Sequence, residues 1–154
     1  MKLNQSTDYA LRVLMYCAAH ESRDQAPTIA EIAHAHDISR SHLMKVVMKL
    51  SALGWLATTR GRGGGLRLLQ SADQVIIGQV VRQMEEDFTL VECFKPQQSN
   101  CRIQGSCRLQ GALAQALDAY LRVLDGLTLA QMVVAPAKTS DIRWVAAAPI
   151  NPLR

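Results

Sequence analysis

Hydrophobic residues recur at three- and four-residue intervals near the start of the chain. This spacing predicts an amphipathic helix from about Ser6 to His20. The residues of its apolar stripe are Ala10, Val13, Leu14 and Cys17. Cys17 therefore belongs to the core, and we leave it out of any reactive site. Asp8 and Arg12 lie nearly opposite this stripe, so they face solvent or a partner subunit.

Two more helices are predicted next. Thr28 and Glu31 have the spacing of a capping box, which starts a helix just after Pro27. Ser39 can cap a third helix that ends at Gly54. The apolar stripe of this third helix consists of Leu43, Val46, Val47 and Leu50. Two helices separated by a short break are typical of a helix-turn-helix.

Two short β-prone runs follow, Trp55–Arg60 and Leu66–Leu69, joined by the glycine-rich run Gly61–Gly65. They predict a β-hairpin, and a helix-turn-helix followed by a basic hairpin is the winged-helix arrangement. A phosphate-binding loop is the alternative for the glycines. The run lacks the Gly-Lys-Ser/Thr ending of a P-loop and does not open a helix, which disfavours that alternative.

The second half of the chain is predicted to be helical. A short helix from Asp73 to about Asp87 should pack on the winged domain, and a leucine-rich helix should span roughly Ser106 to Met132, about 40 Å. So long a stripe exceeds what a small domain can cover, so we expect a homodimer, with packing inside the monomer as the alternative. The final residues, 135–154, contain three prolines and weak periodicity, which predicts a disordered tail.

The predicted fold class is mainly α with a small β-hairpin wing. The expected parts are a winged helix-turn-helix domain (1–72), a connecting helix (73–92), a cysteine loop (93–107), a dimerisation helix (106–132) and the tail (135–154).

The charge of the chain is segregated, although its net value is only +4. From Ile38 to Ala72 there are six basic residues and no acid, whereas Glu85–Glu92 is acidic. A basic surface on a winged helix predicts contact with double-stranded operator DNA, and a solvated face without a partner is the alternative. The predicted DNA-contacting residues are Ser39, Arg40, Ser41, His42, Lys45, Lys49, Arg60, Arg62, Gly63 and Gly64.

The sequence has no uncharged apolar run of 18 residues that could span a membrane. The first residues, Met1–Asn4, include the polar Lys2 and Asn4 and do not resemble a secretory signal peptide. We therefore expect a cytoplasmic protein without a membrane contact. In a reducing compartment the four cysteines favour metal or redox chemistry over structural disulfides.

Three cysteines, Cys93, Cys101 and Cys107, fall within fifteen residues of one polar loop. Thiolates gathered in this way can hold an iron–sulfur cluster or zinc, or act as a thiol switch. The spacing has no Cys-x-x-Cys knuckle of the common zinc type and leaves the three options open. Three unrelated surface thiols are the remaining alternative.

Several segments of the chain carry a family resemblance. The chain up to about Met132 resembles the NsrR family of nitric-oxide-sensing iron–sulfur repressors, in the winged-helix superfamily that includes IscR. The matching segments are Thr7–Arg12, Ser41–Val47, Thr59–Leu66, Glu92–Phe94, Cys101–Leu109 and Leu124–Leu129. The cysteine segments are the more specific part of the match, whereas the Ser41–Val47 and Thr59–Leu66 segments are general to the superfamily.

The resemblance implies a cluster held by Cys93, Cys101 and Cys107, with 4Fe–4S favoured and 2Fe–2S possible. It also implies a ligand in the first helix, and Asp8 from the other subunit is the candidate; a surface ion pair with Arg12 is the alternative. The implied function is a homodimeric repressor that leaves its operator when nitric oxide attacks the cluster.

Other functions compete with this interpretation. A regulator that responds to iron–sulfur status or to thiol redox state would use the same residues. A small iron–sulfur electron carrier is the alternative outside regulation. We predict no enzyme, because no nucleophile–base pair or cofactor fingerprint lies beside the cysteine loop.

Overall fold

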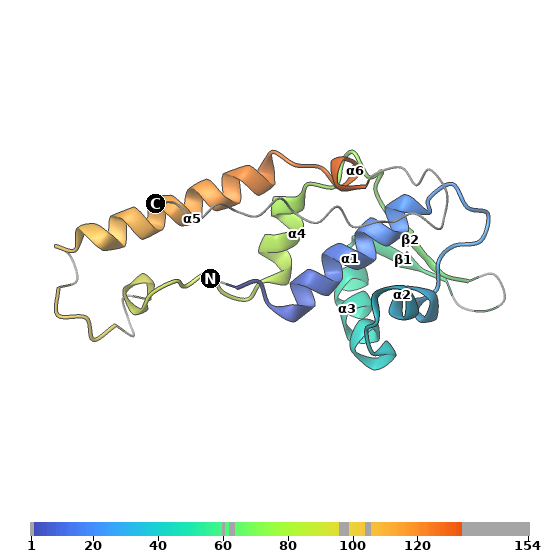
Figure 1. The fold of residues 1–154 in the computed structure, drawn as a ribbon, viewed down its shortest axis with the longest axis horizontal. Helices are drawn as coiled ribbons and strands as arrows, with labels where there is room; N and C mark the ends of the chain where they lie inside the picture. Colours follow the sequence, from blue (N-terminus) through green and yellow to red (C-terminus); the bar gives the residue numbers. More distant parts are fainter. Residues whose placement is uncertain (1, 60, 62–63, 96–98, 104–105, 134–154) are drawn as a thin grey trace.

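The computed structural model describes residues 2–59, 61, 64–95, 99–103 and 106–133. The predicted tail at 135–154 lies outside these residues. At one end of the molecule three helices, α1 (Gln5–Ala19), α2 (Ile29–His36) and α3 (Arg40–Ala52), pack together with a hairpin (Figure 1). The fold is winged-helix, as the sequence predicts.

Local signals explain where these helices begin and end. The side chain of Asn4 caps α1, and Thr28 and Glu31 form the predicted capping box of α2. Ser39 caps α3 by accepting a hydrogen bond from the His42 amide. Just past the end of α3, Gly54 has φ +81°, a conformation that glycine adopts without strain.

The wing is a two-stranded antiparallel sheet. Strand β1 (Leu56–Thr58) pairs with β2 (Leu66–Leu68), and Leu56 lies opposite Leu68. Leu56 and Leu66 are buried, so one face of the hairpin closes the core. Cys17 is buried in the same core, as predicted.

Helix α4 (Ile77–Met84) completes the core of the winged-helix end of the molecule. Its buried residues include Val80, Val81 and Met84. The helix is shorter than the predicted Asp73–Asp87, because Val75 lies in an extended segment before it. The carbonyl of Val75 accepts a hydrogen bond from the amide of Leu129 at 2.8 Å.

The leucine-rich segment is not one continuous helix, which corrects the predicted span of 106–132. Helix α5 (Arg108–Asp125) ends at Gly126, and the chain then becomes extended so that Ile76 and Thr128 form an antiparallel bridge. Thr128 starts the short helix α6 (Leu129–Met132), whose Leu129 is fully buried. Helix α5 is therefore about 27 Å long instead of the predicted length of about 40 Å.

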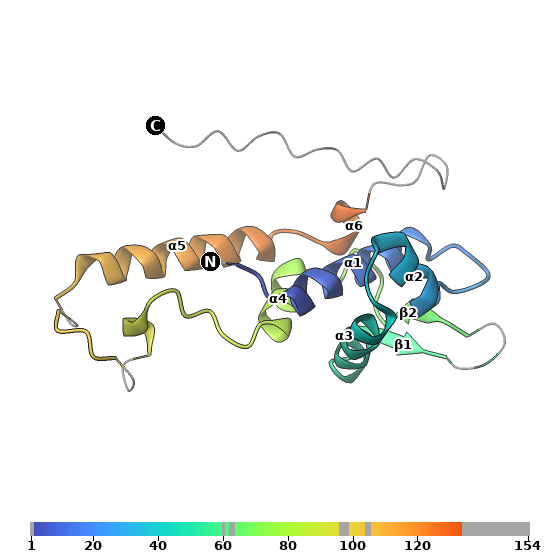
Figure 2. The ribbon, with the colours of Figure 1, turned by 60° about the horizontal axis from the view of Figure 1, so that its bottom comes forward.

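Helix α5 extends away from the winged-helix end, alongside the segment that joins it to α4 (Figures 1 and 2). It has no buried residue in the single chain, although its apolar stripe is pronounced. Leu109 and Val123 are 64% and 65% exposed. Arg82 of α4 and Asp125 of α5 form a bidentate ion pair where the two helices meet.

Candidate DNA-binding surface and cysteine segment

One face of α3 is turned outward. Arg40, Ser41 and Lys45 are exposed on it, opposite the buried stripe that fixes the helix to α1. His42 is half-buried, and its ring meets the ring of Tyr9 edge-on with centroids 5.0 Å apart. Helix α1 thus holds the first turn of α3 in place.

Two methionines on the same outward face were missing from the predicted contacts. Met44 is 46% exposed and Met48 is 69% exposed. The helical period that buries Leu43, Val46 and Val47 also places these methionines outside. The sequence therefore contains the signal for their exposure, whereas the predicted contacts follow charge and polarity.

Lys49 has an internal partner. Its Nζ donates a hydrogen bond to the carbonyl of Met84 at 2.9 Å, which satisfies an orphan carbonyl at the end of α4. The side chain is half-buried at the junction of α3 and α4. This bond fixes α3 against α4. The contact of Lys49 with DNA stays a prediction, and the hydrogen bond of its Nζ to Met84 argues against it.

The predicted wing contacts are described only in part. Arg60, Arg62 and Gly63 lie outside the described residues. The amide of Gly64 donates to the carbonyl of Gly61 at 3.0 Å, which closes the turn between the strands.

The cysteine segment runs from the short 3-10 helix η1 (Glu92–Phe94) to the start of α5. Cys93 is buried in η1, Cys101 is half-buried, and Cys107 is the half-buried N-cap of α5. Gln110 of α5 donates to the carbonyl of Cys93 at 3.1 Å. This bond brings the two ends of the segment together.

The chemistry of this donor set suits an iron–sulfur cluster. Thiolates are the protein ligands that iron–sulfur clusters use, and all three come from one segment with little regular structure. Cys107, the N-cap of α5, makes no side-chain cap hydrogen bond. Among the described residues, no group of three or more His, Cys, Asp or Glu side chains is close enough to hold a metal. The structure thus supplies the donors without bringing them into a coordination geometry.

Cys17 differs sharply from these three cysteines. Burial, followed by the charge of Glu31, raises the pKa of its thiol to about 12. It stays protonated at neutral pH and serves as a core residue.

Asp8 occupies an outward position in the first turn of α1. Its carboxylate accepts two hydrogen bonds from Arg12, from Nε at 3.1 Å and from Nη2 at 2.8 Å. The predicted alternative, an ion pair with Arg12, is therefore present in the single chain. The side chain of Asp8 is still 45% exposed and open to a partner.

Comparison with known proteins identifies the family. A family model named Rrf2 and described as an iron-dependent transcriptional regulator matches residues 3–135. The chain belongs to the Rrf2 family. It is 47% identical over 133 residues to the HTH-type transcriptional regulator NsrR of Bacillus subtilis, covering 86% of this chain and 90% of that one. A second NsrR, from Geobacillus kaustophilus, is 45% identical over 133 residues, with coverage of 86% and 90%.

Two solved structures share the fold of this Rrf2 protein. CymR, the global cysteine regulator of B. subtilis, aligns with a TM-score of 0.70 at 22% identity, over 87% of this chain and 99% of its own. IscR of T. potens aligns with a TM-score of 0.68 at 19% identity, over 86% and 85%. The chain is thus a transcriptional regulator with the Rrf2 winged-helix fold. In the described part of the chain, no helix is long and apolar enough to cross a membrane.

Proposed function

We propose that this regulator is an iron–sulfur-dependent repressor that senses nitric oxide. The observation that carries the proposal is the position of three thiols, Cys93, Cys101 and Cys107, in one segment between the DNA-binding end and α5. The similarity to NsrR proteins supports the same assignment. A cluster held by these thiols would supply iron that reacts with nitric oxide.

DNA binding is assigned to α3 and the wing. Arg40, Ser41 and Lys45 present exposed polar groups on α3 toward a major groove, and His42 lies at the start of the same face. Ser39 caps the helix and fixes where this face begins. Arg60 and Arg62, with the glycines of the turn, would contact the phosphate backbone.

We assign the contact between the two subunits of a homodimer to α5. The leucines of its apolar stripe are only half-buried in the single chain and Leu109 is exposed, and pairing two copies of the helix would bury them further. Two copies also supply two α3 helices for a palindromic site. In such a dimer Asp8 of one subunit would complete the ligands of the other subunit's cysteine segment.

The first experiment is anaerobic purification with a visible absorption spectrum and iron and sulfide analysis. Bound iron and sulfide, together with the visible charge-transfer absorption of iron–thiolate bonds, are the expected result. Cys93→Ala, Cys101→Ala and Cys107→Ala should each abolish iron binding. Cys17→Ala is the matched control and should retain it, because that thiol is buried and protonated.

The second experiment tests the signal. A duplex is selected from a random pool with the anaerobic protein, and its affinity is measured before and after titration with nitric oxide. Release of DNA on nitrosylation is expected. Zinc in place of iron, or release by peroxide but not by nitric oxide, would refute the proposal in favour of a thiol-responsive regulator.

A further inference from the structure

The outer edge of the wing is attached to the segment between α1 and α2. Arg67 lies in the middle of β2, and its Nη2 donates to the carbonyl of Asp24 at 2.9 Å and to that of Arg23 at 3.3 Å. The amide of Leu66 donates to the carbonyl of Pro27 at 2.8 Å. The edge of β2 that faces away from β1 is therefore bonded to this segment.

Close backbone packing reinforces the attachment. A side chain at Gly65 would place its Cβ 2.6 Å from the carbonyl oxygen of Ala26 and 2.8 Å from that of Pro27. Real Cβ atoms do not approach backbone oxygens so closely. Glycine thus permits the contact between the base of the wing and the segment.

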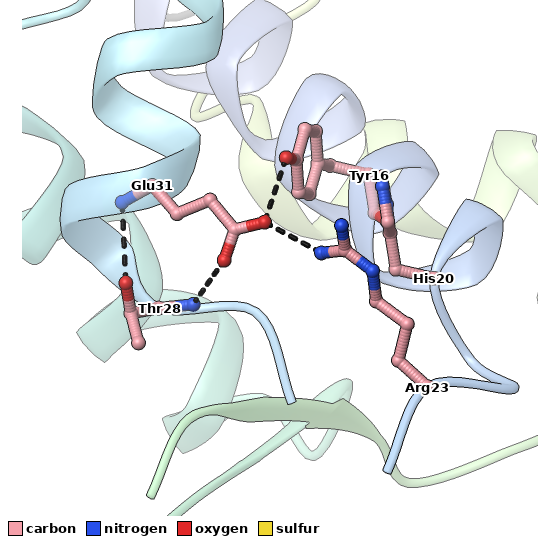
Figure 3. Close-up of polar contacts among 5 residues, drawn as sticks. All are labelled: Tyr16, His20, Arg23, Thr28 and Glu31. Carbon is pink, nitrogen blue, oxygen red and sulfur yellow. Dashed lines mark hydrogen bonds and ion pairs between the residues drawn. The ribbon is translucent and has the colours of Figure 1, made fainter. Parts of the chain in front are cut away.

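The segment is in turn held by Glu31. Figure 3 shows its carboxylate between Tyr16 of α1, Arg23 and Thr28. Oε1 accepts from the Tyr16 hydroxyl at 3.0 Å and from Arg23 Nη1 at 2.7 Å, and Oε2 accepts from the Thr28 amide at 3.4 Å. One carboxylate therefore joins α1, the segment and the start of α2.

We propose that Arg67 is a positioning residue that fixes the angle of the wing through its bonds to the Arg23 and Asp24 carbonyls, and that it does not serve as a phosphate contact. Its charge belongs to the acid-free basic stretch, yet its guanidinium is turned back onto the protein. A wing held in place before binding meets the DNA backbone without a further loss of conformational entropy. The proposal rests on the proposed DNA-binding function.

The test compares Arg67→Met, Arg67→Lys and Lys45→Met in the full chain. Amide exchange at Leu66 is measured in the free protein, and affinity for the selected duplex is measured across a salt series. Arg67→Met should speed Leu66 exchange about tenfold, the value of one charge-assisted hydrogen bond. It should also weaken binding about three- to tenfold while the salt dependence stays parental. Arg67→Lys keeps a donor and should recover most of the protection.

Lys45→Met is the contrasting control. It removes a cation from the proposed DNA-binding face, so the slope of log K against log salt should shrink by about 0.9 for each phosphate that is no longer neutralised. Leu66 exchange should not change.

Three results would overturn the proposal: parental Leu66 exchange in Arg67→Met, a reduced salt slope in that variant like that of Lys45→Met, or fast exchange with parental affinity. If the parent bound no duplex at all, the proposed function would fail. The role of Arg67 in DNA binding would fail with it, although the exchange data would still report how the wing is held.

Discussion

Asp8 offers the sharpest test of how the subunits cooperate, because a surface acid and an iron ligand predict different effects of the Asp8→Ala substitution. In the single chain it pairs with Arg12 four residues away, and the side chains are 45% and 38% exposed. An exposed pair at this spacing stabilises a helix by about 0.3–0.5 kcal/mol. An acid in the first turn adds about 0.3–1 kcal/mol through the helix dipole.

These values limit what Asp8→Ala can do if Asp8 is only a surface acid. The combined loss is at most about 1.5 kcal/mol, which lowers the Tm of a chain of this size by roughly 3–6 °C. The matched control, Arg12→Met, removes the same ion pair and leaves the carboxylate. Both variants of the metal-free protein should therefore unfold slightly below the parent temperature.

The cluster-loaded protein separates the two roles. If Asp8 ligates iron across the dimer, Asp8→Ala still assembles a cluster on three thiolates. That cluster should bleach faster with a chelator, and operator affinity should respond less to cluster loss. Arg12→Met should bleach at the parental rate. Equal bleaching in Asp8→Ala, Arg12→Met and the parent would refute the ligand role and assign the fourth position to another group.

Two more variants test the internal contacts of the DNA-binding end. Burial opposes ionisation of Glu31, but hydrogen bonds from Arg23, Tyr16 and the Thr28 amide hold its pKa below the ordinary value of a glutamate. The stabilisation that these bonds supply is therefore present above the ordinary pKa and is lost as the pH falls through the lowered pKa. Glu31→Gln should cost about 1 kcal/mol in urea unfolding at neutral pH and much less at acid pH; a constant difference would contradict this. Lys49→Met should lower the free energy of unfolding by about 1 kcal/mol and leave the salt dependence of DNA binding unchanged. A reduced salt slope would show instead that Lys49 contacts a phosphate of the DNA.

The parts of the fold that follow local rules could be predicted from the sequence. The stripe of α1, the capping box at Thr28 and the glycine-joined hairpin are each encoded within a few residues. The end of α5 could not be predicted in this way. Leu127 and Leu129 continue the leucine spacing, but backbone pairing with Val75–Ile77, some fifty residues earlier, takes them out of the helix.

The candidate site was predictable in composition but less so in geometry. Three thiols in one loop identify a donor set, and the burial of Cys17 follows from its place on the α1 stripe. Charge alone does not show where a basic side chain points. Lys49 and Arg67 count toward the acid-free stretch, yet both donate to backbone carbonyls of their own chain.

These internal contacts show how the cysteine segment is joined to the DNA-binding end. Trp55, at the base of the wing, donates to Gln83 at 2.8 Å, and Lys49 of α3 donates to Met84. The next residue, Glu85, accepts two hydrogen bonds at 2.9 Å from Asn4, the N-cap of α1. The wing, α3 and α1 are thus bonded to three consecutive residues, the last two of α4 and the first of the segment that leads to Cys93. A movement of that segment that displaces the end of α4 must either break these bonds or carry the DNA-binding elements with it.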